Sequence, residues 1–468
     1  MAEAILYSQN KLEIVDNNAI NLQNLINNDN RLLRFLDATN TYNQFGGYSV
    51  HLYNDHILDI KPYIFAFTSV EALTFPLCNK LGKGCFYNAN IKAISGIGVS
   101  CSDLGYISDY AFYNCSSMTY FYGSNFSYIG HNAFAECSQL NYIYNTLLKV
   151  NYVGSNAFSN CYALNGVIQI NTYDSVYIGK NAFMNCYNIR NIFISNAEDV
   201  FIDDNAFNNM TNLMVVGLNA LKLKSTTFKG CNSINTILLY KLKSLEAYTF
   251  NNRMYYNMGS IITAMLYECE YIGEYNFGNC ERLQYLNIPE CKYIDRFAFW
   301  NCSSLSEVNL LKCEFLGDVA FGFCYNLKTI YAPEWISYSG SPFVGCSPQY
   351  FIANKLSTLP EHFSISFFKN TINIELKNMP YINSSYFKNC SNLTSITLEQ
   401  CSYIGEEAFY GCPLNNLTLL STSKVDLYNV NGISYSEPFS INVLSTVYND
   451  YINDSIWSNF LSYIMSIE

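Results

Sequence analysis

Apolar and polar residues alternate in a short pattern that returns along most of the chain. In one stretch, Ile396 and Leu398 alternate with Ser395 and Thr397. This period of two residues is typical of a short strand with one buried face. The apolar positions of the stretch keep set offsets from a phenylalanine, and they are Phe387, Cys390, Leu393, Ile396, Leu398, Ile404 and Phe409. Each such stretch is predicted to form a strand, a turn and a short helical or 3₁₀ piece around an Ala-Phe pair.

The phenylalanine marks a five-residue motif, Ala-Phe-x-x-Cys in most regular copies. Regular copies are AFYNC (111–115), AFAEC (133–137), AFSNC (157–161), AFMNC (182–186), NFGNC (276–280), AFWNC (298–302), AFGFC (320–324), YFKNC (386–390) and AFYGC (408–412). Degenerate copies lie at Phe65, Phe86, Phe207, Phe228, Phe250 and Phe343, and an irregular one near Phe363. Fifteen steps from Phe65 to Phe409 give a mean period of about 23 residues. Because one unit cannot bury its phenylalanine alone, about sixteen coils are predicted to stack into a solenoid with short parallel strands.

Composition narrows the function classes. Only 13% of the 468 residues are charged, while 41 tyrosines supply much of the polar surface. The net charge of −11 argues against a phosphate-binding surface, so we expect no nucleic-acid partner. The N-terminus has no basic, apolar and small-residue segments in succession, and no run of 18 apolar residues occurs. We therefore expect no signal peptide, no transmembrane segment and no membrane insertion.

The repeated unit resembles the BspA-like leucine-rich repeat, whose pattern is IG-x-x-AF-x-x-C-x-x-L-x-x-I-x-L. The residues that carry the resemblance are YIGEEAFYGCPLNNLTL from residue 403, YIGHNAFAECSQLNYI from 128 and YIDRFAFWNCSSLSEVNL from 293. The resemblance covers residues 57–420. It implies an α/β-type leucine-rich repeat superhelix, capped at both ends. It also implies surface adhesins and host- or partner-binding proteins of bacteria, protists and bacteriophages, and no enzyme.

The two ends fall outside the repeat. Residues 1–56 are predicted to be either an N-terminal cap or a segment that docks the array onto a larger assembly. Residues 421–468 are predicted to be a linker followed by a helical cap. The stretch 441–468 resembles the C-terminal cap of such arrays, with Leu444, Tyr448, Trp457 and Phe460 in comparable places.

The 18 cysteines fall into two columns. Eleven lie three residues after a motif phenylalanine: 115, 137, 161, 186, 231, 280, 302, 324, 346, 390 and 412. Five lie eight residues before one, namely 78, 269, 291, 313 and 401, while Cys85 and Cys101 fit neither column. A column position suits a small buried side chain, and no C-x₂-C cluster is present. We expect structural free thiols and no metal site, although stacked neighbours would lie within disulfide range.

The tyrosines also form columns. Six residues before the motif phenylalanine lie Tyr106, Tyr128, Tyr152, Tyr177, Tyr271, Tyr293, Tyr381 and Tyr403, with Phe201 and Phe315 in the same place. Each precedes an inward aliphatic residue, so each ring is expected to point outward. The column is interpreted as a ladder of stacked rings, with a sugar or protein platform as the alternative.

A second and less regular aromatic group lies on the predicted strand faces. It is the candidate ligand-binding face, and it comprises Tyr120, Tyr122, Tyr142, Tyr144, Phe193, Tyr285 and Tyr331. These residues alternate with inward ones such as Phe121 and Ile330, so they are expected to face solvent. Tyrosine combines a large contact area with a hydroxyl at low entropic cost, which suits recognition of a protein or surface glycan.

The sequence offers little for catalysis. The four histidines, His51, His56, His131 and His362, show no spacing to a carboxylate or nucleophile that indicates a catalytic site. Asp203 and Asp204 are interpreted as helix N-caps, with a cation site as the alternative. The long unit between Phe250 and Phe277 is expected to hold a loop. No phosphate-loop, dinucleotide, serine-hydrolase or zinc-protease motif occurs, so we expect no enzyme, no catalytic residue and no cofactor.

Two functional hypotheses remain. The first is a non-enzymatic adhesin or receptor-recognition protein that contacts a protein or glycan through its strand face. The second is a purely structural component of a large assembly or an intracellular interaction scaffold. A bacteriophage tail or head fibre would combine both, with assembly in the cytoplasm and a final place on a virion or cell surface.

Overall fold

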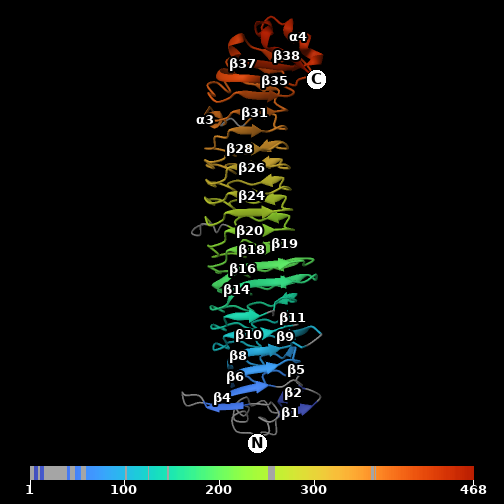
Figure 1. Cartoon of the computed structure of the whole chain (residues 1–468), viewed down its shortest axis with the longest axis vertical. Helices are drawn as coiled ribbons and strands as arrows, with labels where there is room; N and C mark the ends of the chain where they lie inside the picture. Colours follow the sequence, from blue (N-terminus) through green and yellow to red (C-terminus); the bar gives the residue numbers. More distant parts are fainter. Residues whose placement is uncertain are drawn as a thin grey trace. The chain divides into compact units, whose positions relative to one another are not determined.

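The computed structural model describes residues 59–468, apart from 101–102, 125, 145–146, 251–258, 360–362 and 364, together with four strands nearer the N-terminus. The described residues form two compact units, one up to Leu242 and one from Lys243 onward. We call them unit 1 and unit 2. Each is a stack of coils whose strands run side by side (Figure 1).

Each regular coil gives one strand to a front ladder and one to a side ladder. The front strands of unit 1 are, in pairing order, β3 (Thr39–Tyr42), β4 (Tyr48–Tyr53), β6 (Ser69–Phe75), β8 (Asn90–Ile97), β10 (Tyr120–Gly123) and β12 (Tyr142–Tyr144), then a second set of β14 (Asn165–Asn171), β16 (Asn188–Ser195), β18 (Val215–Leu218) and β20 (Thr236–Leu239). Its side strands are β1 (Ile5–Ser8), β2 (Lys11–Ile14), β5 (Asp59–Ile60), β7 (Lys80–Leu81), β9 (Gly105–Ile107), β11 (Phe126–Ile129), β13 (Tyr152–Val153), β15 (Val176–Ile178), β17 (Val200–Ile202) and β19 (Ala220–Lys222).

Unit 2 repeats this arrangement. Its front strands are β22 (Thr263–Leu266) and β24 (Tyr285–Asn287), then β26 (Glu307–Asn309), β28 (Thr329–Tyr331), β30 (Tyr350–Ile352), β31 (Asn373–Leu376), β33 (Ser395–Leu398), β35 (Phe409–Leu419), β37 (Ile433–Leu444) and β38 (Ile464–Ile467). Its side strands are β21 (Ser244–Leu245), β23 (Tyr271–Ile272), β25 (Tyr293–Ile294), β27 (Phe315–Leu316) and β29 (Ser337–Tyr338), then β32 (Tyr381–Ile382), β34 (Tyr403–Ile404) and β36 (Asp426–Leu427).

The motif phenylalanines form the centre of each stack. Phe158 lies 5.0 Å from both Phe134 and Phe183 between ring centroids, with each pair of rings tilted by only 5°. In unit 2, Phe299 and Phe321 repeat the contact at 4.9 Å. These rings are fully buried, as are most leucines and isoleucines of both ladders. The predicted core column therefore packs successive coils against each other.

The segment around each motif phenylalanine forms successive turns, and the helical or 3₁₀ piece expected there was wrong. We call this third side of the coil the motif face. Residues two positions before and two after the phenylalanine have positive φ, such as Asn156 (56°) and Asn160 (63°). A left-handed residue ends a helical run of hydrogen bonds. Alternate amides donate to the next coil instead: Phe134 N donates to Ala157 O at 2.7 Å and Glu136 N to Ser159 O at 2.9 Å. The amides between them close turns within the coil, as Ala135 N does by donating to Asn132 O at 3.2 Å.

Helix is accordingly scarce among the described residues. The α-helices are α3 (Ile365–Phe368) and α4 (Tyr448–Ile452), and the 3₁₀ segments are η1 (Val430–Gly432), η2 (Ser445–Val447) and η3 (Trp457–Tyr463). The predicted superhelix of short parallel strands is confirmed, with about 18 turns instead of sixteen. The count is higher because front strands occur before the first motif phenylalanine and after the last, as β4, β37 and β38 do.

The ends differ from the regular coils. Two antiparallel pairs, β1 with β2 and β3 with β4, join the side and front ladders through β5 and β6. At the other end, Trp457 is buried and its indole Nε1 donates to Val425 O at 2.7 Å. Tyr451 is also buried, and its hydroxyl accepts from Val425 N at 2.9 Å. That residues 1–56 and 421–468 act as caps stays a prediction.

Candidate binding surfaces

Four of the seven candidate face residues meet on two neighbouring front strands of unit 1. Tyr120 and Tyr122 on β10 pair in register with Tyr142 and Tyr144 on β12. The Tyr122, Tyr142 and Tyr144 side chains are 38%, 43% and 50% exposed, whereas Tyr120 is half-buried. Tyr144 contacts Tyr122 edge to face at 6.3 Å and stacks on Tyr142 at 5.7 Å. We call these four residues the tyrosine cluster.

The other three candidate residues lie elsewhere. Phe193 is half-buried on β16 and lies across from Gly217 on β18, where a Cβ atom would approach the ring to 2.8 Å. Tyr285 is exposed on β24 and Tyr331 half-buried on β28, both in unit 2. The described contacts therefore bring four of the seven predicted residues together, and the remaining three stay separate predictions.

The side ladder carries the regular tyrosine column outward, as expected. Tyr128, Tyr152 and Tyr177 pair in register, with ring centroids 4.6 Å and 5.2 Å apart. In unit 2, the Tyr271 hydroxyl donates to Asp295 at 3.0 Å, and partial burial together with this carboxylate raises the pKa of Tyr271 to about 12. The stacking favours the interpretation of this column as a structural ladder, because stacked rings cover each other's faces.

An aromatic group on the motif face of unit 1 was missed by the sequence analysis. Tyr87 stacks on Tyr113 at 5.1 Å and contacts Tyr63, Phe67 and Tyr110 at 5.7 to 6.5 Å. Phe67 is the most exposed of the five. The signal was present in the sequence, because aromatic residues flank the motif phenylalanine in three successive units. The prediction of a binding face rested on the strand positions alone and did not include these flanking residues.

The cysteines occupy interior corners, as their columns predicted. The 17 described cysteines are buried, and none of them forms a disulfide with another described cysteine. Nine of them donate a thiol hydrogen bond of 3.0 to 3.3 Å to the carbonyl of the motif phenylalanine one coil earlier: Cys115, Cys137, Cys161, Cys186, Cys231, Cys302, Cys324, Cys346 and Cys412. Burial raises the pKa of the Cys161 and Cys186 thiols, so they stay protonated and unreactive.

The polar residues considered for chemistry have structural partners. Asp203 and Asp204 cap no helix, which corrects that prediction. Lys224 Nζ lies 2.7 Å from Asp203 and 3.1 Å from Asp204 and holds the pKa of Asp203 below its ordinary value. His131 Nδ1 accepts from Ser155 N at 2.9 Å. The described part of the chain does not include the His51 side chain, His56 or His362. Residues 251–258 of the predicted loop also lie outside it, and the same long unit contains strand β22.

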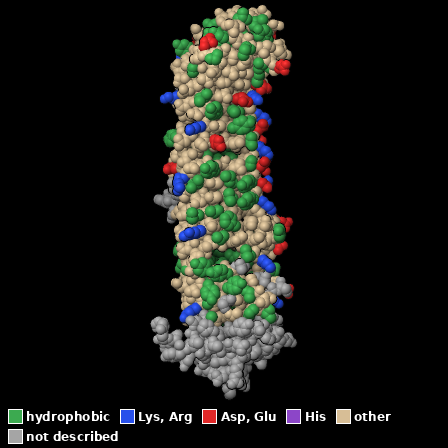
Figure 2. All heavy atoms as spheres, viewed as in Figure 1, with side chains coloured by type: hydrophobic (Ala, Val, Ile, Leu, Met, Phe, Trp, Pro, Cys, Tyr) green, Lys and Arg blue, Asp and Glu red, His purple; other side chains and the backbone are tan. Residues whose placement is uncertain are grey.

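Charged side chains gather in pairs between successive coils of unit 2. Lys292 reaches Glu270 at 2.9 Å, and Glu270 also lies 3.8 Å from Lys243. Lys312 pairs with Glu290, and Lys355 with Glu334. In Figure 2, acidic and basic side chains alternate along the right edge. Apolar side chains are scattered over the surface that faces the viewer. Because the charges pair with each other, this edge presents no single-sign surface.

Across the described ranges, no group of His, Cys, Asp or Glu side chains could hold a metal ion. None of the helices in the same residues has the length and apolarity needed to cross a membrane.

Two parallel ladders, a stacked phenylalanine core and outward aromatic residues define a leucine-rich repeat solenoid. The chain belongs to the BspA-type leucine-rich repeat family, whose region model (six copies) matches residues 58–176, 146–257, 252–375 and 343–429. Leucine-rich repeats are in general non-enzymatic binding scaffolds. No curated protein matches the chain.

Solved structures with similarity to the chain include three bacterial proteins. A leucine-rich repeat protein from Bacteroides ovatus is 19% identical with a TM-score of 0.37, covering 92% of this chain and 98% of that one. A leucine-rich cell surface protein from Faecalibacterium prausnitzii is 14% identical with a TM-score of 0.23, covering 82% and 93%. A leucine-rich repeat protein from Leptospira interrogans is 11% identical with a TM-score of 0.33, covering 76% and 91%.

Proposed function

We propose that this chain is a non-enzymatic recognition protein that binds a protein or glycan ligand through the tyrosine cluster of unit 1. The observation that carries the proposal is the group of Tyr120, Tyr122, Tyr142 and Tyr144 on paired strands. Hydrogen bonds between the two strands hold the backbones of these residues in register. Ligand binding therefore costs little conformational entropy, because the backbone is already ordered. Three of the rings are exposed and carry hydroxyls that can recognise polar ligand groups.

The charge distribution favours ligand recognition through contacts that are not ionic. The cluster contains no ionic side chain, and the chain as a whole has few. Contacts would therefore come from ring surfaces and hydroxyl hydrogen bonds, which depend little on salt. A protein surface with exposed polar and apolar groups or a glycan fits this chemistry better than a polyanion.

The proposal is tested by replacing Tyr142 and Tyr144 with alanine together. Loss of two exposed anchors is expected to weaken binding to cells or glycan arrays by at least about tenfold, while the chain stays folded, because neither side chain contributes to the buried core. Tyr350→Ala is the matched control, because Tyr350 is 43% exposed on front strand β30 and lies outside the candidate face. Unchanged affinity in the double variant would show that the tyrosine cluster is not the binding site.

The second candidate function is structural, as a component of a larger assembly docked through residues 1–56. The pairing of β2 with β5 and β4 with β6 favours it, because it makes this segment the outermost described part of both ladders of unit 1. A place on a cell surface or on a virion, for example as a bacteriophage fibre, belongs to this proposal. The neighbouring genes would test the location, since a secretion locus and a virion gene cluster exclude each other.

A further inference from the structure

The side ladder of unit 2 is interrupted at one coil. Front strands β30 and β31 pair in register, but the side strands stop at β29 and resume at β32. In the regular coils a side strand lies six residues before the motif phenylalanine, which for Phe363 is Ser357. Residues 357–359 form no strand. The core continues beside this gap because Phe363 and Phe367 stack at 4.0 Å. A coil that lacks one strand leaves unfilled space on that side.

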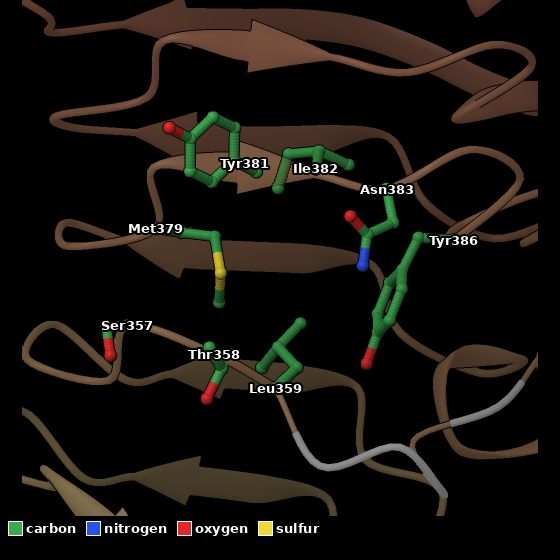
Figure 3. A pocket seen from close by; sticks show the side chains of 8 residues that line it. All are labelled: Ser357, Thr358, Leu359, Met379, Tyr381, Ile382, Asn383 and Tyr386. Atoms are coloured by element: carbon green, nitrogen blue, oxygen red, sulfur yellow. The ribbon is translucent and has the colours of Figure 1, made fainter.

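That space is a hollow of about 150 Å³ next to β32 (Figure 3). It is lined by Ser357, Thr358, Leu359, Met379, Tyr381, Ile382, Asn383 and Tyr386. Its floor is apolar, since Met379 and Ile382 are almost fully buried. Leu359 and Met379 extend toward each other across it, and the ring of Tyr386 lies at the opposite side.

The rim of the hollow is polar and uncharged. Ser357, Thr358 and Asn383 are exposed, and among the described residues their side chains have no hydrogen-bond partner in the protein. Tyr381 adds a ring that is 61% exposed. A hydroxyl both donates and accepts, and the amide of Asn383 offers two donors and one acceptor. None of the described residues that line the hollow is Lys, Arg, Asp or Glu.

Size and lining together select the ligand. Pockets for drug-sized molecules occupy about 300 to 1,000 Å³, so this hollow holds one ring. A charged group would find no opposite charge among the described lining residues. A purely apolar side chain would cover the polar rim without pairing it, which costs free energy. A pyranose has an apolar C–H face for the floor and hydroxyls for the rim.

We propose that this hollow binds one uncharged hexose unit of a glycan, against Met379 and Tyr381 and with Asn383 as its main hydrogen-bonding group. The site lies on the side ladder, so it does not rest on the tyrosine cluster of the front ladder. A single sugar is expected to bind weakly, with a dissociation constant on the order of 1 mM, because few atoms are in contact.

The test uses the full chain and a panel of methyl glycosides of glucose, galactose and mannose, observed by saturation-transfer NMR and by titration. At least one glycoside is expected to bind. Asn383→Ala should weaken that binding about tenfold through loss of its hydrogen bonds, and Tyr381→Ala should weaken it several-fold. Tyr293→Ala is the matched control, because Tyr293 is 45% exposed at the same place of the side ladder away from the hollow. All variants should keep the wild-type melting temperature.

Three results would overturn the proposal. The first is that no methyl hexoside transfers saturation at about 20 mM, well above the expected dissociation constant. The second is binding that survives both Asn383→Ala and Tyr381→Ala. The third is preferential binding of N-acetyl-tyrosine amide, which would assign the hollow to a peptide side chain. The Tyr142 and Tyr144 double variant should leave hexoside binding unchanged, so failure here and failure of the proposed function can be told apart.

Discussion

Left-handed backbone positions are the residue-scale feature that shapes every regular coil. The place two residues before the motif phenylalanine is Asn132, Asn156, Asn181 and Asn205 in four successive coils, with φ between 53° and 56°. Asparagine tolerates this region better than most residues. On the other side of the phenylalanine, Asn185 donates to Asn160 at 2.7 Å and Asn209 to Asn185 at 2.8 Å. The frequent asparagines beside the motif phenylalanine are thus explained by the left-handed backbone conformation at these positions.

Val319 occupies the same place with a φ of 56°, where a β-branched side chain is strained. We expect Val319→Asn to raise the free energy of unfolding by about 1 kcal/mol, because asparagine relieves that strain. Urea unfolding measures the change. The reciprocal variant Asn181→Val is the control and should lower stability by a similar amount. A stabilised Asn181→Val variant would contradict the explanation.

Buried thiols make stability depend on pH in the alkaline range. Burial raises the pKa of Cys269 and Cys401 to about 11 and that of Cys231 to about 12. An unfolded cysteine has a pKa of about 8.5, so the unfolded chain loses protons first as pH rises. The contribution to stability is therefore complete below about pH 8.5 and declines from there through the folded pKa values.

We accordingly expect the urea midpoint of the reduced protein to fall between about pH 8 and pH 10. Tyrosines with raised pKa add a change of the same sign, so the thiol part needs its own comparison. A Cys269→Ala, Cys401→Ala double variant should show a shallower decline than the wild type. Equal slopes in the two proteins would assign the decline to other groups.

At the scale of elements, stability resides in the contacts between neighbouring coils. Phe158 contacts one ring of the coil before and one of the coil after, and it is fully buried. Phe158→Ala is expected to cost about 3 to 5 kcal/mol, from lost burial and the cavity left behind. Unfolding in urea followed by circular dichroism measures this. The exposed Phe67 on the motif face provides the control, and Phe67→Ala should cost far less. Comparable losses would show that the ring column is not the main cohesive element.

The elements also show where sequence patterns reach their limit. Alternation of Ile396 and Leu398 with polar residues predicted β33 correctly, because a strand with one buried face imposes a period of two. The prediction of a helical piece in the motif segment failed, because an Ala-Phe pair fits a helix as well as a turn. Only the backbone φ angles distinguish the two. Asp203 and Asp204 were misassigned for the same reason, since without a helix the partner of these carboxylates is Lys224 from the next coil.

At the scale of the whole molecule, the N-terminal segment bears on how the solenoid ends. Deletion of residues 1–56 removes the strands that pair with β5 and β6 and leaves two strand edges without partners. If the segment is a cap, the truncated chain should self-associate, which light scattering after size exclusion would detect. A truncated chain that stays monodisperse would contradict the cap. Incorporation of that chain into a larger assembly would contradict the docking role.

The sequence by itself determined the repeat, its period, the phenylalanine and cysteine columns and the outward direction of the tyrosines. Each follows from a local pattern that every coil must satisfy to bury its own side chains. Only the tertiary structure decided that Tyr142 and Tyr144 meet Tyr120 and Tyr122, and that the coil before β32 lacks a side strand and leaves a hollow. These features depend on how one coil is registered against the next. A periodic sequence specifies the coil, whereas a site forms where neighbouring coils differ.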